Sequence, residues 1–301
     1  MDQQTDRPDA RGFAPKVAIV MRSYNDRDVI RGTLEMIRRQ AYRNFTLWNF
    51  DSTSTDGTLE IIKEFNDPQH IHQNSPASYN PGTVLNDAVH TVGAEVLVFI
   101  NSDATPERDD WLARLIAPLA DPQVGVAYGR QTARPDCRAL FVKDTERAFG
   151  DGREAARWVH FFSMANCAVC RDILERFPFE TRVQYSEDIE WSYRLRKAGL
   201  EIRYVAEAAA THSHNYTLRQ SFKRQFGEGK AEAWIFREGE LNTSFLRYCL
   251  LPFGMEVLRD LRWAAAKGSL DALVNSVPLR AVQKWGRWRG LTEGRKAYGT
   301  H

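Results

Sequence analysis

Strand-like and helix-like segments alternate along the first half of the chain. Three short apolar runs predict buried strands: Lys16–Met21, Phe45–Phe50 and Glu95–Ile100. Each is followed by apolar residues at helical spacing: about Arg27–Gln40, Gly57–Phe65 and Asp109–Ala120. Strands that alternate with helices through short connections pair in parallel. We therefore expect an α/β fold with a mostly parallel central sheet and helices on both faces.

Polar segments follow each predicted strand, at 22–26, 51–57 and 101–106. In sheets of this kind, ligands bind beyond the carboxyl ends of the strands. A carboxylate at Asp51 can accept a hydrogen bond from an imide N–H such as that of uracil or thymine. Asp103 leaves a buried strand, where it can hold a hard divalent cation. The structural alternative is that Asp51 and Asp56 cap turns and that Asn101–Asp103 forms a turn before Pro106.

An acidic cluster at Ser186-Glu187-Asp188-Ile189-Glu190-Trp191 opens another predicted helix, Glu187–Ala198, which ends at Gly199. Three carboxylates this close repel one another, so a cation, a polar substrate or a proton to accept would explain them. One of them could act as a general base. Acidic residues also stabilise the positive end of a helix dipole, which is the alternative explanation.

The remaining segments predict a less regular middle and a helical end. The pattern is irregular from Gln131 to Phe179, with a strand-like run at Phe161–Val169. Ile202–Val205 and Ala208–His212 predict two short strands. Beyond Leu218 the chain is predicted to be helical, with breaks at four residues: Gly239, Pro252, Gly268 and Pro278.

Charge and composition limit the cellular setting. The net charge of +2 combines 15 Lys/Arg and 8 Asp/Glu in residues 219–301, a net of +7, with 26 and 31 in residues 1–218, a net of −5. No apolar run is long enough to span a bilayer, and the first fifteen residues contain no apolar signal-peptide core. Cys167 and Cys170 have metal or redox spacing but lie in an apolar run, where we expect buried thiols. We therefore expect a cytoplasmic protein.

The ordered motifs resemble a known enzyme family. Ser-Tyr-Asn-Asp at 23–26, Asp51 with the Ser-Thr-Asp-Gly-Thr that follows, Asn101-Ser102-Asp103-Ala104 and the Glu187–Trp191 cluster are similar to the inverting family 2 glycosyltransferases of GT-A fold. The resemblance covers about residues 16–230. The Asn-Ser-Asp-Ala motif, the acidic cluster and a later His-Ser-His-Asn-Tyr run look most like rhamnosyltransferases.

The resemblance implies a role for each motif. Tyr24, Asn25, Asp51, Asn101 and Ser102 would contact the donor nucleotide. Asp103 would bind one Mg²⁺ or Mn²⁺, and Asn101 stands where the family usually has the first Asp of its D-x-D motif. Asp188 would be the general base.

Glu187 and Glu190 would orient donor or acceptor hydroxyls, and Trp191 would pack under the acceptor. The Gln-x-x-Arg-Trp signature of processive enzymes is absent, which favours addition of a single sugar.

Three further groups have two interpretations each. In His212-Ser213-His214, alternation places both imidazoles on one side of the chain; His214 would complete the metal site, or both are surface histidines. Gly82 and Asn86 look like the loop and helix start that lie beside the donor diphosphate in the family. Alternatively, they only form the turn that precedes a helix. Arg219, Lys223 and Arg224, with His212, would cover the phosphates as a lid, or they form a solvated basic helix face.

The C-terminal segment combines tryptophans with basic residues: Trp263, Trp285, Trp288, Arg259, Arg262, Lys267, Arg280, Lys284, Arg287 and Arg289. Such helices suit peripheral binding to an anionic membrane, here the inner face of the plasma membrane. A homodimer interface or a cap on the catalytic domain explains them equally well. No recognised nucleic-acid-binding signature is present.

The sequence thus predicts a short flexible N-terminus (1–15), a GT-A catalytic domain (16–235) and a helical basic and aromatic extension (236–301). The expected activity is transfer of rhamnose or another 6-deoxyhexose from a deoxythymidine diphosphate donor to a saccharide or lipid-linked saccharide in cell-surface polysaccharide synthesis. Uridine diphosphate sugars are the runner-up donors. Two other classes are less well supported. A nucleotidyltransferase would have a Gly-rich phosphate loop after the first strand, which this sequence lacks, and a non-catalytic sugar-binding protein would not need Asp188.

Overall fold

The structure is a computed structural model that describes residues 12–75, 79–152, 161–239 and 243–299. Most of the predicted flexible N-terminus therefore lies outside the described residues. The chain forms two compact units, and the first comprises the residues up to Thr132, Ala148–Thr181 and Trp191–His212. The second comprises Ala133–Arg147, Arg182–Glu190 and the residues from Ser213 onward.

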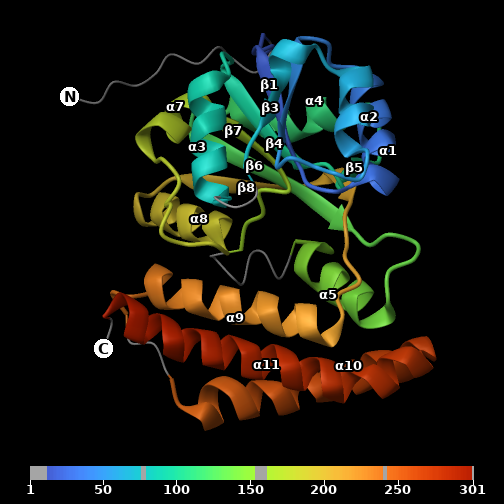
Figure 1. Ribbon diagram of the computed structural model, residues 1–301, viewed down its shortest axis with the longest axis vertical. Helices are drawn as coiled ribbons and strands as arrows, with labels where there is room; N and C mark the ends of the chain where they lie inside the picture. The colour runs from blue at the N-terminus through green and yellow to red at the C-terminus, as the bar shows by residue number, and fades with distance from the viewer. Residues whose placement is uncertain (1–11, 76–78, 153–160, 240–242, 300–301) are drawn as a thin grey trace. The chain divides into compact units, whose positions relative to one another are not determined.

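A single sheet organises the first unit (Figure 1). The described strands lie in the order β3-β2-β1-β4-β7-β6-β8-β5. Their bounds are β1 Val17–Ser23, β2 Phe45–Asp51, β3 Ile71–Gln73, β4 Val96–Asn101, β5 Thr105–Pro106, β6 Val124–Thr132, β7 Asn166–Cys170 and β8 Glu201–Thr211.

Helices cover both faces of this sheet. Figure 1 shows α1 (Arg27–Arg38), α2 (Thr58–Phe65) and α4 (Trp111–Ile116) on one side, and α3 (Pro81–Thr91) and α7 (Arg171–Arg176) on the other. The short helical turns η1 (Pro68–His70) and η3 (Ala117–Ala120) and helix α8 (Glu187–Lys197) complete the elements of this region. The predicted α/β architecture is confirmed.

The pairing of β1 positions the ends of its neighbours. β1 pairs in parallel with β2 and with β4, so that Ser23 lies opposite Asp51 and Arg22 lies opposite Asn101. β7 is antiparallel to β4 and β6, and β5 is antiparallel to β8. The polar residues that follow β1, β2 and β4 therefore leave the sheet at one edge.

The core of the first unit is apolar, with a few polar groups that are paired. Residues 17–21 of β1 are at most 1% exposed. The indole Nε1 of Trp111 donates to Oδ1 of Asn166 at 3.0 Å, which satisfies a buried polar pair between α4 and β7. Cys167 and Cys170 are buried free thiols in β7, consistent with their apolar setting in the sequence.

Differences from the sequence predictions have local causes. β6 escaped prediction because Gly125 and Gly129 interrupt its apolar pattern; a Cβ at Gly129 would lie 2.1 Å from the backbone oxygen of Ala208, so this close approach requires glycine. The two predicted strands at 202–205 and 208–212 form the single strand β8. Its register with β6 shifts between Gly129 and Gln131, so a bulge causes the apparent break.

The second unit is helical beyond Leu218, as predicted, but two of its predicted breaks are wrong, and α5 lies in a stretch for which no helix was predicted. Its elements are α5 (Ala139–Phe149, all but its last two residues), α9 (Leu218–Ile235), η4 (Leu246–Leu250), α10 (Leu251–Lys267) and α11 (Leu270–Tyr298). Pro252 lies in the first turn of α10, where its missing N–H is tolerated. Pro278 lies inside α11 at an exposed position, where water can satisfy the freed carbonyl.

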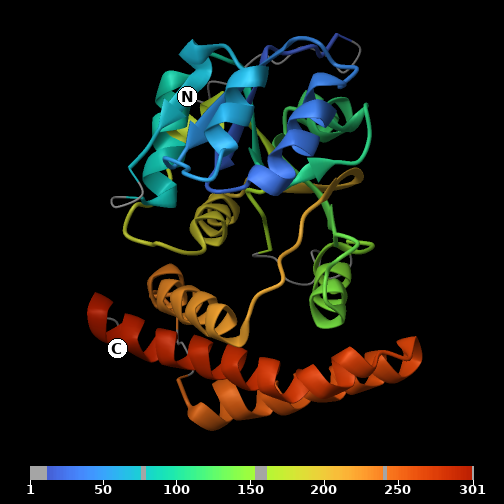
Figure 2. The same cartoon turned by 45° about the vertical axis from the view of Figure 1, so that its right-hand side comes forward.

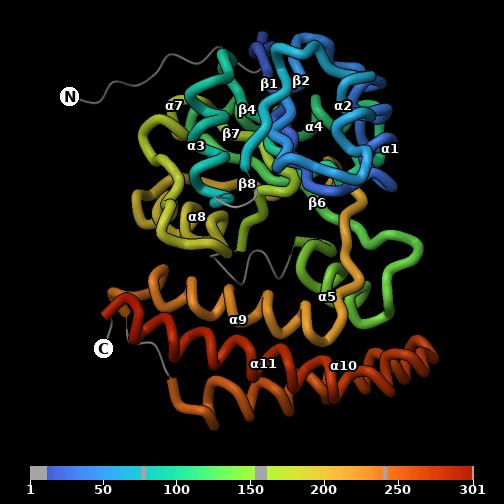
Figure 3. Tube along the Cα trace, in the orientation of Figure 1, coloured from blue at the N-terminus to red at the C-terminus, as the bar shows by residue number. Residues whose placement is uncertain are grey.

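Small residues bring α9 and α11 into close contact. A Cβ at Gly290 would lie 1.9 Å from the backbone oxygen of Phe226, and one at Gly229 would lie 2.0 Å from that of Arg287. Figure 3 shows the two helices running side by side over most of their length. Larger residues at either glycine would therefore force the backbones apart.

A buried ion-pair cluster joins α5, α10 and α11. Lys143 Nζ contacts Glu256 Oε1 at 2.9 Å and Asp260 Oδ1 at 2.5 Å. Arg280 donates to Oδ2 of Asp260 at 2.8 Å and binds both carboxylate oxygens of Asp144. Asp260 is fully buried and Arg280 is 3% exposed, so each charge depends on its partners.

Replacement of Asp260 by alanine is expected to lower the free energy of unfolding by about 3–5 kcal/mol, because it leaves Lys143 and Arg280 buried with reduced compensation. Urea unfolding monitored by circular dichroism would measure this. Glu64→Ala is the matched control, because Glu64 pairs with Arg31 on the surface and its loss should change stability little. Equal effects of the two substitutions would contradict a structural role for the buried cluster.

Candidate active site

The loop after β1 is fastened to the loop after β2. Asn25 has a left-handed backbone conformation with φ of 54°. Its backbone N–H donates to Oγ of Ser54, and its side-chain Oδ1 accepts from the N–H of Thr55, both at 2.9 Å. Tyr24 next to it is 53% exposed. The two loops thus form one surface at the carboxyl edge of the sheet, with the Tyr24 ring accessible.

Asp51 is fully buried beneath these loops. Its Oδ2 accepts from Oγ of Ser23 at 2.8 Å and from Oγ of Ser54 at 2.7 Å, and its Oδ1 accepts from the N–H of Ser54 at 2.7 Å. A carboxylate offers about four acceptor positions, so most of those on Asp51 hold the loop in shape. Recognition of a nucleobase by Asp51 stays a prediction.

The segment after β4 lies beside the first loop. Arg22 donates to Oδ1 of Asn101 at 3.2 Å, and Ser102 Oγ donates to Oδ2 of Asp26 at 2.5 Å. Burial raises the pKa of Asp26, the hydrogen bonds from Ser102 and Tyr24 oppose that rise, and the negative charge of Asp103 adds to it. Acidic groups of two loops therefore share one region, where a cation would relieve their repulsion.

Asp103 faces a histidine at the end of β8. The antiparallel pair Thr105 and Thr211 aligns β5 with β8 and brings the two segments together. Nε2 of His212 lies 3.4 Å from Oδ1 of Asp103, and both side chains are largely buried. The carboxylate that follows β4 and the imidazole that follows β8 therefore meet within the first unit.

Gln131 fixes the orientation of this imidazole. Oε1 of Gln131 lies 2.7 Å from Nδ1 of His212, and Nε2 of Gln131 donates to Oγ of Ser163 at 2.8 Å. An amide oxygen only accepts, so Nδ1 carries the proton, and in a neutral imidazole Nε2 presents its lone pair toward Asp103. A lone pair and a carboxylate repel unless a proton or a cation lies between them. This donor set fits a divalent cation.

His214 lies two residues beyond His212 and belongs to the second unit. Its ring stacks on Tyr216 with centroids 5.1 Å apart. On either side of it, Ser213 Oγ accepts from the N–H of Arg134 at 2.9 Å, and Asn215 Oδ1 accepts from that of Arg138 at 2.8 Å. These hydrogen bonds hold the backbone around His214 in place.

The acidic cluster occupies the first turn of α8. Ser186 has a positive φ of 58°, and its carbonyl accepts from the N–H of Glu190 at 2.9 Å to start the helix. Glu187 and Asp188 are half-buried, whereas Glu190 is 3% exposed. Three carboxylates in the first turn interact favourably with the positive end of the helix dipole. They therefore stabilise the start of α8, whether or not they also take part in catalysis.

Trp191 does not have the accessible position expected for a residue under an acceptor. Its side chain is fully buried, its ring stacks on Phe179 with centroids 5.0 Å apart, and its Nε1 donates to the carbonyl of Phe177 at 2.6 Å. Trp191 therefore anchors α8 in the core of the first unit. The expectation is corrected because an aromatic residue in an amphipathic helix start packs inward as readily as toward a ligand.

Gly82 and Asn86 pack α3 against the segment that contains Phe179 and Glu180. Asn86 Nδ2 donates to the carbonyl of Phe179 at 2.9 Å, and its Oδ1 accepts from the N–H of Phe179 at 2.8 Å. A Cβ at Gly82 would lie 2.3 Å from the carbonyl oxygen of Glu180. These contacts favour the structural interpretation of both residues over donor binding. Asn80 caps the helix, accepting from the N–H of Thr83 at 2.9 Å.

The basic residues expected to form a lid lie in the first turns of α9. Thr217 and Gln220 form a capping box that begins the helix. Arg219, Lys223 and Arg224 are exposed. Arg224 also donates to Glu228 at 2.8 Å and to the hydroxyl of Tyr216 at 2.6 Å. Arg219 and Lys223 therefore present charge to solvent, while Arg224 is held by neighbouring groups.

Sequence reasoning missed Asp26, Arg22 and Gln131. Asp26 closes the Ser-Tyr-Asn-Asp motif and was therefore detectable as a polar residue after a strand. Gln131 lies in β6, a strand that the sequence did not reveal, and its partner His212 is far along the chain. Only the pairing of β6 with β8 places the two side chains together.

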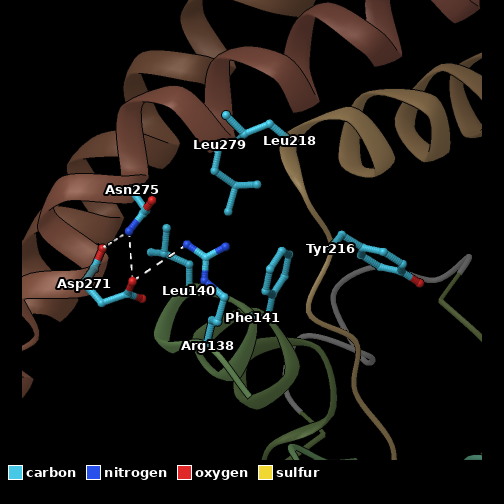
Figure 4. A pocket seen from close by; sticks show the side chains of 8 residues that line it. All are labelled: Arg138, Leu140, Phe141, Tyr216, Leu218, Asp271, Asn275 and Leu279. Atoms are coloured by element: carbon cyan, nitrogen blue, oxygen red, sulfur yellow. Dashed lines mark hydrogen bonds and ion pairs between the residues drawn. The ribbon is translucent and has the colours of Figure 1, made fainter. Parts of the chain in front are cut away.

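One pocket lies within the second unit, and none of the predicted site residues lines it (Figure 4). Its lining combines aliphatic, aromatic and polar side chains: Arg138, Leu140, Phe141, Tyr216, Leu218, Asp271, Asn275 and Leu279. Asp271 accepts from Asn275 at 2.8 Å and lies 3.7 Å from Arg138. These groups compensate one another, so the pocket is a packing feature between α5, α9 and α11.

Comparisons with known proteins agree with this geometry. A family model described as "Glycosyl transferase family 2" matches residues 18–177. The O-antigen chain rhamnosyltransferase RfbN of Salmonella typhimurium is 27% identical over 237 residues, which cover 74% of this chain and 75% of that protein. The O-antigen chain rhamnosyltransferase WbaN of Salmonella anatum is 31% identical, covering 62% of this chain and 64% of that protein.

Solved structures share the fold. A mannosyltransferase from Pyrobaculum calidifontis, in complex with GDP-Man and Mn²⁺, superposes with a TM-score of 0.65 at 20% identity, over 95% of this chain and 88% of that one. Glucosyl-3-phosphoglycerate synthase from Mycobacterium tuberculosis, with Mn²⁺ and UDP-glucose, gives 0.56 at 17% identity, over 75% and 81%. The GT-A fold is confirmed.

Gly82→Ala is expected to destabilise the chain by about 1–3 kcal/mol, because the added methyl group meets a backbone carbonyl that cannot move freely. Thermal unfolding measures the effect. Gly93→Ala is the matched control, since a Cβ there meets no atom within 4 Å. A loss of stability no greater than that of the control would contradict the docking role and reopen the donor-binding interpretation.

Proposed function

Because the chain belongs to glycosyl transferase family 2 and is a glycosyltransferase, we propose that it transfers rhamnose or another 6-deoxyhexose from a deoxythymidine diphosphate donor, with inversion. The acceptor is a saccharide or lipid-linked saccharide hydroxyl in cell-surface polysaccharide synthesis. The rhamnosyltransferase names of two relatives support the sugar. Uridine diphosphate sugars are the alternative donors, supported by the UDP-glucose complex of a structural neighbour.

The observation that carries the proposal is the register of β1 with β2 and β4. It brings Asp51 and Asn101–Asp103 to one edge of the sheet, where Asp103 faces His212. Tyr24, Asn25 and Asp51 then bind the nucleoside, and Asn101 and Ser102 contact the ribose side. Loops at the carboxyl ends of parallel strands are the usual place for such a ligand.

A divalent cation, Mg²⁺ or Mn²⁺, would be held by Asp103, His212 and His214. When bound, it supplies positive charge to the diphosphate leaving group. Gln131 holds the imidazole of His212 in the orientation that presents Nε2 to this position. Arg219, Lys223 and Arg224 on α9 add positive charge as a lid over the phosphates.

Asp188 acts as the general base in this proposal. Its carboxylate takes the proton of the acceptor hydroxyl, whose oxygen attacks the anomeric carbon while the bond to the nucleoside diphosphate breaks on the opposite face. Glu187 and Glu190 orient donor or acceptor hydroxyls. Asp188 is half-buried, so an acceptor can reach it, and it is held at the start of a helix whose next turn is anchored by Trp191.

The reaction runs at the cytoplasmic face of the membrane if the acceptor is lipid-linked. Within the described residues, no helix combines the length and the apolar character needed to cross a bilayer. We propose a peripheral contact with the inner face of the plasma membrane, supported by the exposed basic residues of the C-terminal helices, such as Arg262 and Lys267.

Incubation with a panel of nucleotide sugars is expected to release nucleoside diphosphate, fastest from a deoxythymidine diphosphate 6-deoxyhexose. Asp188→Asn should lower turnover by about 10²–10⁴-fold because the base is lost, while donor affinity measured by calorimetry stays nearly unchanged. Asp87→Asn, an exposed carboxylate on α3, is the control and should retain turnover. Release of pyrophosphate would instead indicate nucleotidyl transfer, and full turnover by Asp188→Asn would refute the base assignment.

Mn²⁺ binding provides an independent test of the metal ligands, without turnover. Asp103→Asn and His212→Ala should each abolish binding of Mn²⁺ measured by electron paramagnetic resonance with the donor diphosphate present. Gln131→Leu should weaken it by about 10–100-fold, because the imidazole loses its orientation. His90→Gln, an exposed histidine on α3, should leave it unchanged. Wild-type affinity in the Asp103 variant would exclude that carboxylate as a ligand.

A further inference from the structure

The helical hairpin of the second unit has apolar side chains on its outside. Gly268, with φ of 64°, ends α10, and Ser269 caps α11 by accepting from the N–H of Ala272 at 3.3 Å. This tight connection keeps the two helices together (Figure 2). Eleven large apolar residues from η4 to α11 are exposed: Leu246, Leu250, Leu251, Met255, Leu258, Leu261, Leu270, Leu273, Val274, Val277 and Trp285.

The exposed apolar residues follow helical spacing. In α10, Leu251, Met255 and Leu258 are separated by four and three residues and therefore share a face. In α11, Leu270, Val274 and Val277 have the same spacing, with Leu270 72% and Val274 66% exposed. We refer to these two stripes, with the exposed basic residues beside them, as the hairpin face. Apolar patches of this kind mark interaction surfaces.

The inner sides of the same helices carry the charge. Glu256 and Asp260 of α10 are 7% and 0% exposed, and both bind Lys143. In α11, Ser276 and Arg280 are buried and bind Asp260. The buried side of the hairpin thus combines ion pairs with a small apolar cluster that includes Ala264, Ala272 and Leu279, while larger leucines and valines face solvent. Solubility alone would favour the opposite distribution, so a partner for the outer side is implied.

The net charge of the hairpin face is positive. Its exposed basic residues are Arg247, Arg262 and Lys267, together with Arg259, which is exposed but pairs with Glu256 at 3.0 Å. Asp271 is exposed as well, whereas both acidic residues of α10 point inward. Leucine, valine and tryptophan flanked by lysine and arginine match the boundary between phosphate headgroups and acyl chains.

The structure also corrects which residues of the C-terminal segment are available. Arg280 is buried in ion pairs, Arg287 pairs with Glu232, and Trp288 donates to the carbonyl of Thr243 at 3.0 Å. Of the three tryptophans noted in the sequence, Trp285 is exposed at 53%. The accessible surface is thus aliphatic and basic, rather than the tryptophan-rich surface that the sequence indicated.

We propose that the hairpin face lies in the interfacial region of an anionic lipid bilayer. Leu251, Met255, Leu258, Leu270, Val274 and Val277 enter the acyl boundary. Arg247, Arg262 and Lys267 bind lipid phosphates. A second copy of the chain is a poorer partner, because a two-fold contact would place like charges opposite one another. The proposal deepens the proposed function, since it holds the enzyme where a lipid-linked acceptor is found.

Flotation of the full-length protein with lipid vesicles tests the proposal, without any sugar donor. The protein should float with vesicles in which phosphatidylglycerol replaces half of the phosphatidylcholine, and should remain largely unbound with phosphatidylcholine alone. Higher salt should weaken binding, since the attraction is partly electrostatic. Equal binding to both vesicles, or to neither, would overturn the proposal.

Two sets of variants locate the contact. Leu270→Gln with Val274→Gln should weaken binding about tenfold or more, because the favourable transfer of two apolar side chains from water into the bilayer is lost. Arg262→Gln with Lys267→Gln should weaken it about fivefold per charge. Leu270→Met with Val274→Ile retains the apolar surface, and Lys63→Gln removes an exposed charge on α2 of the first unit; both controls should bind as wild type. Undiminished binding in the glutamine variants would refute the assigned face.

Light scattering of the lipid-free protein tests the competing explanation, in which the hairpin face binds a second copy of the chain. We expect a monomer whose mass is unchanged by Leu270→Gln with Val274→Gln. A dimer that this double variant dissociates would overturn the proposal in favour of a contact between copies. Nucleoside diphosphate release is measured separately on a soluble acceptor, so loss of membrane binding and loss of transferase activity are distinguishable.

Discussion

The parallel pairing of β1 with both β2 and β4 is the constraint on which the candidate site depends. It places Ser23 opposite Asp51 and Arg22 opposite Asn101, so the polar segments after three strands begin at the same level. A slip of one residue in either pair would turn every side chain to the other face of the sheet. The apolar residues 17–21, which are buried on both faces, prevent such a slip. The hydrophobic core thus sets the geometry of groups that are themselves polar.

A second pairing completes the site and could not be anticipated. β5 is only two residues long, yet its pairing with β8 brings Asp103 to His212, and β6 beside β8 supplies Gln131. The imidazole is therefore oriented by an amide from one strand and faces a carboxylate from another loop. Such an arrangement gives a cation a preformed position, because little reorganisation is needed on binding.

The two units distribute their charges by different rules. The first has a core of mainly apolar residues, whereas the second buries an ion-pair cluster of Lys143, Glu256, Asp260 and Arg280, with half-buried Asp144 beside it, and exposes leucines and valines. Buried ion pairs contribute less to stability than apolar packing of the same volume, but they require matched partners and so specify one arrangement of helices. The charged side chains that hold the hairpin together are thus buried, while leucines and valines are among the side chains that it exposes.

The sequence by itself determined the alternating architecture, the three strands β1, β2 and β4, the polar segments after them and the acidic start of α8. These are local features, fixed by apolar periodicity and by turn and capping chemistry over a few residues. Only the tertiary structure decided that Trp191 is a core residue, that Gly82 and Asn86 dock a helix, that Gln131 orients His212, and which face of α10 is exposed. Each of these depends on which distant segment lies opposite a side chain. For Gln131 and His212, the glycines of β6 and the bulge in β8 also concealed the strands that bring the two side chains together.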